Sequence, residues 1–190
     1  MKIENPTKTA LMDLAEEILQ TQSFANVSFQ TLADGVGIKK GSVYYHFESK
    51  DQLAEALIDR TRHRLRDALQ QIVNEPPPKQ LRIYINWFLR NIGAAEKMCP
   101  GANFAVCWDA LPVSTREKVK HLYATHQSGL KAIIERGQAQ RVFGTALPAK
   151  TLAEAIFALL QGGLLSSRVA EDPKQFEAVK TTALQLVETG

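Results

Sequence analysis

Apolar residues recur every three or four positions along most of this chain, which is the spacing of amphipathic helices. In residues 5–20, for example, Leu11, Ala15 and Ile18 share one helical face behind Asn5, a favourable N-cap residue. No stretch of useful length alternates with the period of two that marks a strand. The pattern therefore predicts an all-α chain with about nine helices.

Two short helices are expected next, followed by a long one. Ser28 can cap the first short helix and Gly37 can end it, while the segment "KKGSVYYHF" forms the second. Ser49 and Gln52 match a capping box that opens the long helix. The predicted core of this N-terminal part consists of Ala15, Ile18, Leu32, Ala33, Val36, Ile38, Val43 and Phe47.

Prolines mark the later boundaries, because proline lacks a backbone donor and disfavours helix before it. Residues 76–78, three consecutive prolines, form the clearest break. Further helices are expected at residues 80–92, between Pro100 and Pro112, from a capping box of Ser114 and Glu117, after Pro148 and after Pro173. We assign residues 1–50 to an N-terminal helical domain and residues 51–190 to a larger one.

Composition excludes several classes of protein. The chain has 190 residues, 45% of them hydrophobic and 23% charged, with a net charge of +3, as is usual for a globular protein. It contains no run of about 18 apolar residues and no secretory signal, so a soluble, cytoplasmic protein is expected. No Glu-x-x-His pair, glycine-rich phosphate loop or nucleophile elbow appears, so we expect no enzyme, no metal and no cofactor.

The two short helices, joined by "DGVGIKK", are typical of a helix-turn-helix. In such a unit the second helix enters the DNA major groove, and its N-terminal residues meet the base edges. The residues at that position are Lys39, Lys40, Gly41 and Ser42. The residues that follow include four whose side chains end in polar groups able to bind the flanking phosphates: Tyr44, Tyr45, His46 and Lys50. A partner with a phosphate-lined groove explains why a short helix presents so many hydrogen-bonding groups outward.

The segment "SFQTLADGVGIKKGSVYYHFESKDQL" resembles the DNA-binding signature of the TetR family of bacterial transcription repressors. The matching positions are Ser28, Leu32, Ala33, Gly37, Gly41, Ser42, Tyr44, Tyr45, His46, Phe47 and Lys50. The resemblance implies that Tyr44, His46 and Lys50 hold phosphates, assisted by Ser28 and Ser42. It places Gln30, Lys39, Lys40 and Tyr45 nearest the bases. Phe29 departs from a threonine common in the family, so one phosphate contact is lost.

Two observations favour a plainer interpretation of these residues. Residues 1–51 contain five lysines and seven acidic residues, so this part is not strongly basic. Tyr44 and Tyr45 can also pack on the following helix with their hydroxyls in water, and Lys39 and Lys40 can be ordinary surface charges. The sequence alone leaves these alternatives open.

The last two predicted helices are the expected interface of a homodimer. Residues 149–169 are apolar nearly all round and contain Gly162 and Gly163, which permit close helix approach. Residues 174–187 have one apolar stripe. The family resemblance implies that both helices form a four-helix bundle with a second copy, which would bind a palindromic operator. Burial within one chain explains the same pattern.

The resemblance also implies a pocket for a small-molecule effector among the middle helices, where aromatic residues are frequent. The candidate residues, each of which can equally be part of the core, are Trp87, Phe104, Trp108, Tyr123 and His126. Their composition indicates a small, largely apolar effector. Cys99 and Cys107 are either buried, inert thiols or sensors of oxidants, since Cys99 precedes Pro100 at an expected helix start. A scaffold protein without DNA binding remains a rival interpretation.

Overall fold

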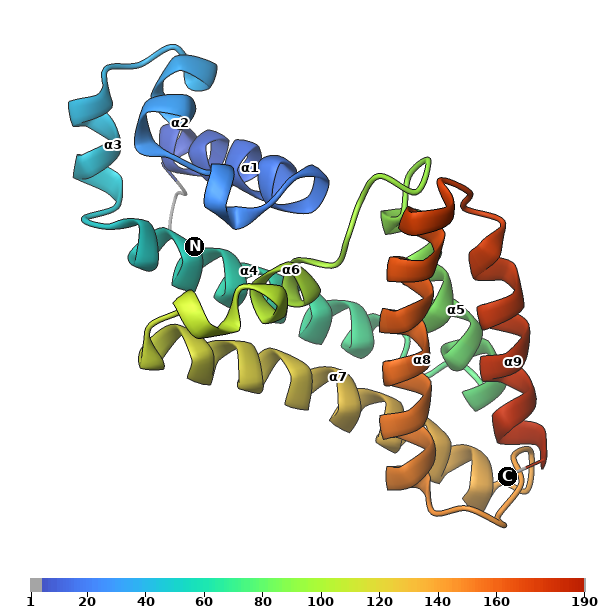
Figure 1. The fold of residues 1–190 in the computed structure, drawn as a ribbon. Coiled ribbons are helices and arrows are strands. Elements are labelled where there is room, and N and C mark those ends of the chain that lie inside the picture. The colour runs from blue at the N-terminus through green and yellow to red at the C-terminus, as the bar shows by residue number, and fades with distance from the viewer. Residues whose placement is uncertain (1–4, 190) are drawn as a thin grey trace. The chain divides into compact units, whose positions relative to one another are not determined.

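The computed structural model describes residues 5–189, which contain nine α-helices and no strand, so the predicted all-α fold is confirmed (Figure 1). The α-helices are α1 (Pro6–Thr21), α2 (Phe29–Val36), α3 (Lys40–His46), α4 (Lys50–Gln71), α5 (Pro77–Asn91), α6 (Pro100–Val106), α7 (Val113–Ala139), α8 (Ala149–Ala170) and α9 (Gln175–Thr189). Two 3₁₀ turns, η1 (Phe24–Asn26) and η2 (Trp108–Ala110), lie in the connections.

Local hydrogen bonds explain where the helices of the helix-turn-helix begin and end. The Ser28 hydroxyl accepts from the Thr31 N–H at 3.0 Å and caps α2. Gly37 ends α2 with φ +74°, a left-handed conformation that glycine adopts without a steric penalty. The Ile38 N–H then donates to the Ala33 carbonyl at 3.0 Å and satisfies one of the open carbonyls of the helix end.

One predicted capping box is present and the other is wrong. The Gln52 N–H donates to Ser49 Oγ at 3.1 Å, and the Glu48 N–H donates to Gln52 Oε1 at 2.7 Å, so α4 opens as expected. Helix α7, however, begins at Val113, which places Ser114 inside its first turn rather than at its cap. Pro112 provides the first carbonyl acceptor instead, for the Arg116 N–H at 2.9 Å.

The chain divides into two compact units, neither of which is continuous in sequence. The first unit contains the chain through Thr61 together with Pro100–Lys120, and the second contains Arg62–Cys99 and the residues from His121 onward. Helices α4 and α7 therefore each contribute to both units. This division differs from the boundary that we expected at residue 50, because α6 and the start of α7 pack with the N-terminal helices.

The core of the first unit is formed mainly by α1, α2, α3 and α6. Val43 and Phe47 of the α3 region are almost fully buried, and so are Ala15, Leu32 and Ala33 among the other predicted core residues. Ile18 is 8% exposed, while Val36 and Ile38 are half-buried. The ring of Phe24 packs against that of Phe104 with centroids 5.1 Å apart, which anchors α6 to the turn after α1.

Arg60, in the middle of α4, links this helix to α1. Its guanidinium bonds Asp13 Oδ1 at 2.7 Å, the Met12 carbonyl at 2.8 Å and the Glu16 carboxylate. The side chain of Arg60 is only 14% exposed, so this pair of carboxylates compensates a mostly desolvated charge. The first unit therefore holds its helices by an ion-pair network as well as by apolar packing.

In the second unit, α8 and α9 lie side by side (Figure 1). Phe176 of α9 is fully buried, and α9 comes so close to Gly163 that an added Cβ atom there would lie 2.8 Å from Val179 Cγ1. Among the described residues, α8 is the single helix long and apolar enough to cross a membrane by length and composition. Core helices of soluble proteins meet the same criterion, and nine residues of α8 are buried within the chain.

Candidate nucleic-acid interface

Helix α3 is anchored on one side and presents polar tips on the other. Val43 and Phe47 are buried, whereas Tyr44 is 51% exposed and Tyr45 is 84% exposed. Residues on adjacent helical positions point in different directions, which separates the anchor from the two tyrosines. The side chains of Tyr44 and Tyr45 therefore point outward, as predicted, and they are not packed beneath a neighbouring helix.

Phe29 supports Tyr44 from α2. Its ring is buried and meets the Tyr44 ring edge-on, with centroids 4.9 Å apart. Tyr45 makes a similar edge contact with His46 at 5.1 Å. The departure at position 29 therefore has a structural use, because an apolar ring there restricts the orientation of Tyr44.

The start of α3 is open. Lys39, Lys40, Gly41 and Ser42 are all exposed, and a Cβ atom added to Gly41 would meet no atom within 4 Å. The Ser42 N–H bonds the Lys39 carbonyl at 2.8 Å, while no side chain caps this helix start. A partner surface can therefore approach the backbone at Gly41 closely, with two lysine side chains beside it.

Five of the predicted DNA-contacting residues border one hollow of about 590 Å³ in the first unit. They are Ser28, Gln30, Lys40, Tyr44 and Lys50. Two of them also have local partners: Ser28 Oγ lies 2.7 Å from Thr31 Oγ1, and Gln30 Nε2 donates to Asp34 Oδ1 at 2.8 Å. These bonds orient the two polar side chains along the exposed face of α2.

Lys50 differs from the other residues of the hollow because its ammonium group points inward. Its Nζ donates to the Ala25 carbonyl at 3.0 Å and lies 4.7 Å from the centre of the Phe24 ring. Burial lowers the pKa of Lys50 from its ordinary value. In this conformation Lys50 stabilises the turn before α2.

The five effector candidates fall into two groups. Trp87, Tyr123 and His126 belong to the second unit, whereas Phe104 and Trp108 belong to the first, where Phe104 is fully buried against Phe24. The five candidates are thus divided between the two units. Trp108 instead lies under the guanidinium of Arg116, at 5.7 Å from its ring centre.

An aromatic cluster surrounds the three candidates of the second unit. His126 stacks on Phe157 at 4.9 Å, and Tyr123 meets the same Phe157 edge-on at 5.1 Å. Trp87 contacts the buried Tyr84 ring at 5.5 Å. Burial raises the pKa of Tyr123 to about 12, so its hydroxyl stays protonated near neutral pH.

The two cysteines are free thiols and both are half-buried. Cys99 directly precedes the first residue of α6, as expected, and Cys107 directly follows the last. Cys107 Sγ lies 4.0 Å from Ser23 Oγ in the first unit, while Cys99 belongs to the second. A sensing role for either thiol stays a prediction.

Three arginines that our sequence analysis did not single out, Arg62, Arg66 and Arg136, line a groove of the second unit. The alternation of arginines from Arg60 to Arg66 is the sequence signal that points to two of them. Among the described residues, no group of three or more histidine, cysteine, aspartate or glutamate side chains is arranged to hold a metal ion.

The second helix of the helix-turn-helix, α3, is exposed and polar, and we call it the reading helix. This arrangement, followed by a second helical unit, is typical of a DNA-binding regulator. The family model of the bacterial regulatory proteins of the tetR family matches residues 11–57, and that of the tetracyclin repressor-like C-terminal domain matches residues 77–183. This chain belongs to the TetR family. It is therefore a DNA-binding transcriptional regulator and not an enzyme.

Several relatives resemble the chain over most of its length. An uncharacterized HTH-type transcriptional regulator of Lactococcus lactis is 27% identical, with 93% of this chain and 92% of that protein covered. The HTH-type transcriptional regulator EthR of Mycobacterium tuberculosis is 26% identical, over 89% of this chain and 79% of that protein. A solved TetR transcriptional regulator of Legionella pneumophila is 27% identical with a TM-score of 0.88, covering 98% of this chain and all of that one.

Proposed function

We propose that the protein is a ligand-responsive repressor that binds a palindromic operator as a homodimer and is released by a small, largely apolar effector. The single observation that carries the DNA-binding part is the exposure of the reading helix. Tyr44 and Tyr45 are 51% and 84% exposed while Val43 and Phe47 are buried, so the polar tips are available to phosphates. Lys39 and Lys40 supply positive charge at the end of α3 that meets the bases.

The exposed face of α8 supports the homodimer. Its exposed positions include a stripe of small and apolar residues spaced alternately by three and four: Ala155, Ala158, Gly162, Leu165 and Val169. Leu165 is 53% exposed and Val169 is 80% exposed, which is costly in water without a partner. Gly162 adds to this argument, because a Cβ atom there would meet nothing within 4 Å of the chain. A glycine in an open helix face lowers stability unless another surface needs the space.

The route from effector to DNA is helix α4 in this proposal. It begins in the first unit at Lys50, directly after the reading helix, and its later residues belong to the second unit. An effector releases the operator only if it binds the released arrangement more tightly than the DNA-bound one. We place the protein in the bacterial cytoplasm, where its operator is.

The experiment that tests this function is a mobility-shift selection from a pool of random duplexes, run at two salt concentrations. Recovery of a palindrome with half-sites about one helical turn apart supports the repressor. Weak binding that ignores sequence and disappears at the higher salt concentration contradicts it and favours the scaffold interpretation.

A further inference from the structure

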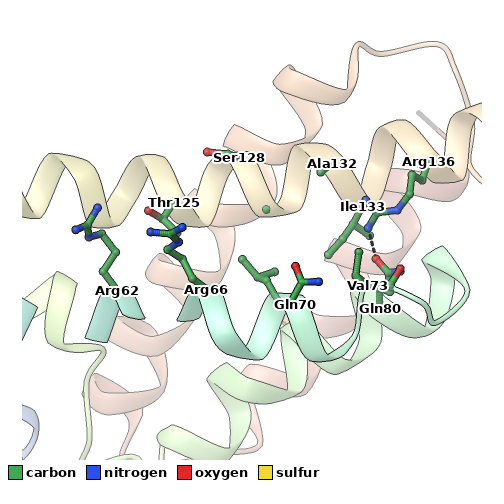
Figure 2. Close-up of a pocket in the computed structure, with 12 residues that line it drawn as sticks. Arg62, Arg66, Gln70, Val73, Gln80, Thr125, Ser128, Ala132, Ile133 and Arg136 are labelled. Atoms are coloured by element: carbon green, nitrogen blue, oxygen red, sulfur yellow. Dashed lines mark hydrogen bonds between the residues drawn. The ribbon is translucent and has the colours of Figure 1, made fainter. Parts of the chain in front are cut away.

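A groove in the second unit is lined by the later part of α4, the start of α5 and the middle of α7 (Figure 2). Its volume is about 410 Å³, which is within the usual range for sites of small molecules. None of the five aromatic effector candidates lines it. The groove is therefore a separate feature from the aromatic cluster.

The charged side chains that line the groove are all positive. The twelve described residues that line it include Arg62, Arg66 and Arg136 and no aspartate or glutamate. Glu75 and Glu135, which do not line it, pair with Lys79 at 2.9 Å and with Lys131 at 3.0 Å. Figure 2 shows Arg62 and Arg66 extending from α4 toward α7. A groove with three guanidinium groups and no acid in its lining attracts anions.

Arg136 is held in place by a fully buried glutamine. Gln80, which is 1% exposed, accepts a hydrogen bond from Arg136 Nη2, as the dashed line in Figure 2 marks. The Gln80 amide in turn donates to the Val73 carbonyl at 2.9 Å and to the Glu75 carbonyl at 2.5 Å. Arg136 Nε is buried and has no protein partner. A guanidinium held in one orientation by a buried partner is preorganised to bind a carboxylate or phosphate group.

The rest of the lining is mostly apolar, with Gln70 as a further polar residue. Leu69, Val73, Ala132 and Ile133 contribute aliphatic surface. The hydroxyls of Thr125 and Ser128 donate to carbonyls of their own helix, so the arginines are the main donors of the groove. Because Gly129 has no side chain, Leu69 comes within 2.6 Å of where its Cβ would be, which closes the groove floor.

We infer that this groove binds an amphipathic organic anion, a carboxylate or phosphate group on a short aliphatic body, and that this anion is the effector. The inference rests on the proposed function, and it adds an anionic headgroup to the largely apolar effector proposed there. The headgroup meets Arg136, and the aliphatic body lies along Ile133 and Leu69 toward Arg66, which Figure 2 shows at the other end of the groove. Guanidinium groups suit both headgroups because their forked donors match two oxygens at once.

The test is calorimetric titration of the full-length protein with octanoate, octyl phosphate, the neutral analogue octanamide and inorganic phosphate. We expect at least one of the two octyl anions to bind at least tenfold more tightly than octanamide and at least tenfold more tightly than inorganic phosphate. The ratio of the affinities for octanoate and octyl phosphate identifies the preferred headgroup. Equal affinity for octanamide, binding of inorganic phosphate as tight as that of octyl phosphate, or no binding of either octyl anion overturns the inference.

Substitutions of single arginines test where the anion binds. Arg136→Gln should weaken the bound anion at least tenfold, and Arg66→Gln should weaken it by a smaller factor because Arg66 lies at the far end of the groove, while both change octanamide less than twofold. Arg64→Gln is the matched control, because Arg64 is an exposed arginine of α4 that does not line the groove, and it should keep the anion affinity within twofold. Arg66 is itself exposed, so its substitution leaves the fold intact. Unchanged affinity in both groove variants contradicts the assignment.

The same titration repeated with operator DNA separates the two proposals. If octanoate or octyl phosphate binds through the arginines but does not release the operator, the anion site stands and its effector role fails. If the wild-type protein selects no operator at all, the repressor function fails, while the calorimetry still decides whether the groove recognises anions.

Discussion

The Tyr84 hydroxyl and Nδ1 of His126 form a hydrogen bond of 2.7 Å, and both side chains are buried in the second unit. Burial raises the pKa of Tyr84 well above its usual value and lowers the pKa of His126 to about 4, so both groups are neutral at pH 7. This bond joins α5 to α7 within an otherwise aromatic core.

Acidification should weaken the second unit through His126. Burial lowers the pKa of His126 from 6.5 to about 4, so between these values the unfolded chain binds more protons than the folded one. The stabilisation is complete above pH 6.5 and falls as the pH drops toward 4. Urea unfolding at pH 7.5 and 4.5 should show that His126 contributes about 2–3 kcal/mol of the difference.

The variants for this measurement are His126→Phe and His121→Phe. The first keeps an aromatic ring against Phe157 but cannot titrate, so it should lose less stability on acidification than the wild type does. His121 is exposed on the same helix, so His121→Phe is the matched control for placing a phenylalanine on α7. Identical pH profiles for wild type and His126→Phe would contradict the assignment.

Tyr44→Phe should weaken operator binding without affecting folding. The substitution removes the hydroxyl that we assign to a phosphate and retains the ring that meets Phe29. Since a hydrogen bond to a charged group contributes roughly 1.5–3 kcal/mol, we expect about a tenfold or greater loss of affinity. Fluorescence anisotropy with labelled operator measures this loss, and thermal unfolding checks stability. Tyr123→Phe in the second unit is the control, and wild-type affinity in Tyr44→Phe argues against the contact.

Lys50→Met distinguishes the two roles of this lysine. Loss of its bond to the Ala25 carbonyl should lower the free energy of unfolding by about 1 kcal/mol. If the ammonium group also meets a phosphate when DNA is bound, the slope of log affinity against log salt should fall by about 0.9. We expect both changes, because Lys50 borders the same hollow as Tyr44. A lower stability with an unchanged salt slope would leave Lys50 a purely internal contact.

Val169→Glu should convert the proposed homodimer to a monomer. Val169 is 80% exposed in the single chain, so a glutamate there costs the monomer little, but it places a charge in the proposed interface. Sedimentation velocity measures the change in mass. Val113→Glu is the control, since Val113 is 74% exposed at the start of α7, and it should remain dimeric. A dimeric Val169→Glu protein would exclude this face of α8.

The adjacent glycines of α8 should respond oppositely to alanine within one chain. Gly163→Ala brings a Cβ within 2.8 Å of Val179 Cγ1 and should destabilise the protein by about 1–3 kcal/mol. Gly162→Ala meets nothing within the chain and improves helix propensity by about 1 kcal/mol. Urea unfolding of the Val169→Glu background isolates these effects. In the wild-type background, Gly162→Ala should instead weaken association, which dilution experiments detect.

Sequence patterns predicted the helices well because capping residues and prolines act locally. Ser28, Gly37 and Ser49 do in the structure what their positions predict. Ser114 failed as a cap because Pro112 already supplied the first acceptor of α7, so the helix began earlier. The outward orientation of the polar side chains of α3 was also predictable, because Val43 and Phe47 occupy the buried side of this helix of two turns.

The spacing of apolar and polar residues could not predict contacts between segments that are distant in sequence. Arg136 lies 70 positions after Arg66, and nothing in the spacing of either residue indicates that both line one groove. Phe104 was an effector candidate because of its aromatic surroundings in sequence, but its partner is Phe24, about eighty residues earlier. The inward turn of Lys50 likewise depends on the carbonyl of Ala25, which a linear motif does not reveal.

The contact between Phe24 and Phe104 has a consequence for synthesis of the protein. During translation the first three helices leave the ribosome well before α6, and until then one face of Phe24 has no partner. The DNA-reading part therefore reaches its final packing only after roughly the first 120 residues have emerged. A nascent or truncated chain that ends near residue 50 would expose this ring to water and be prone to aggregation.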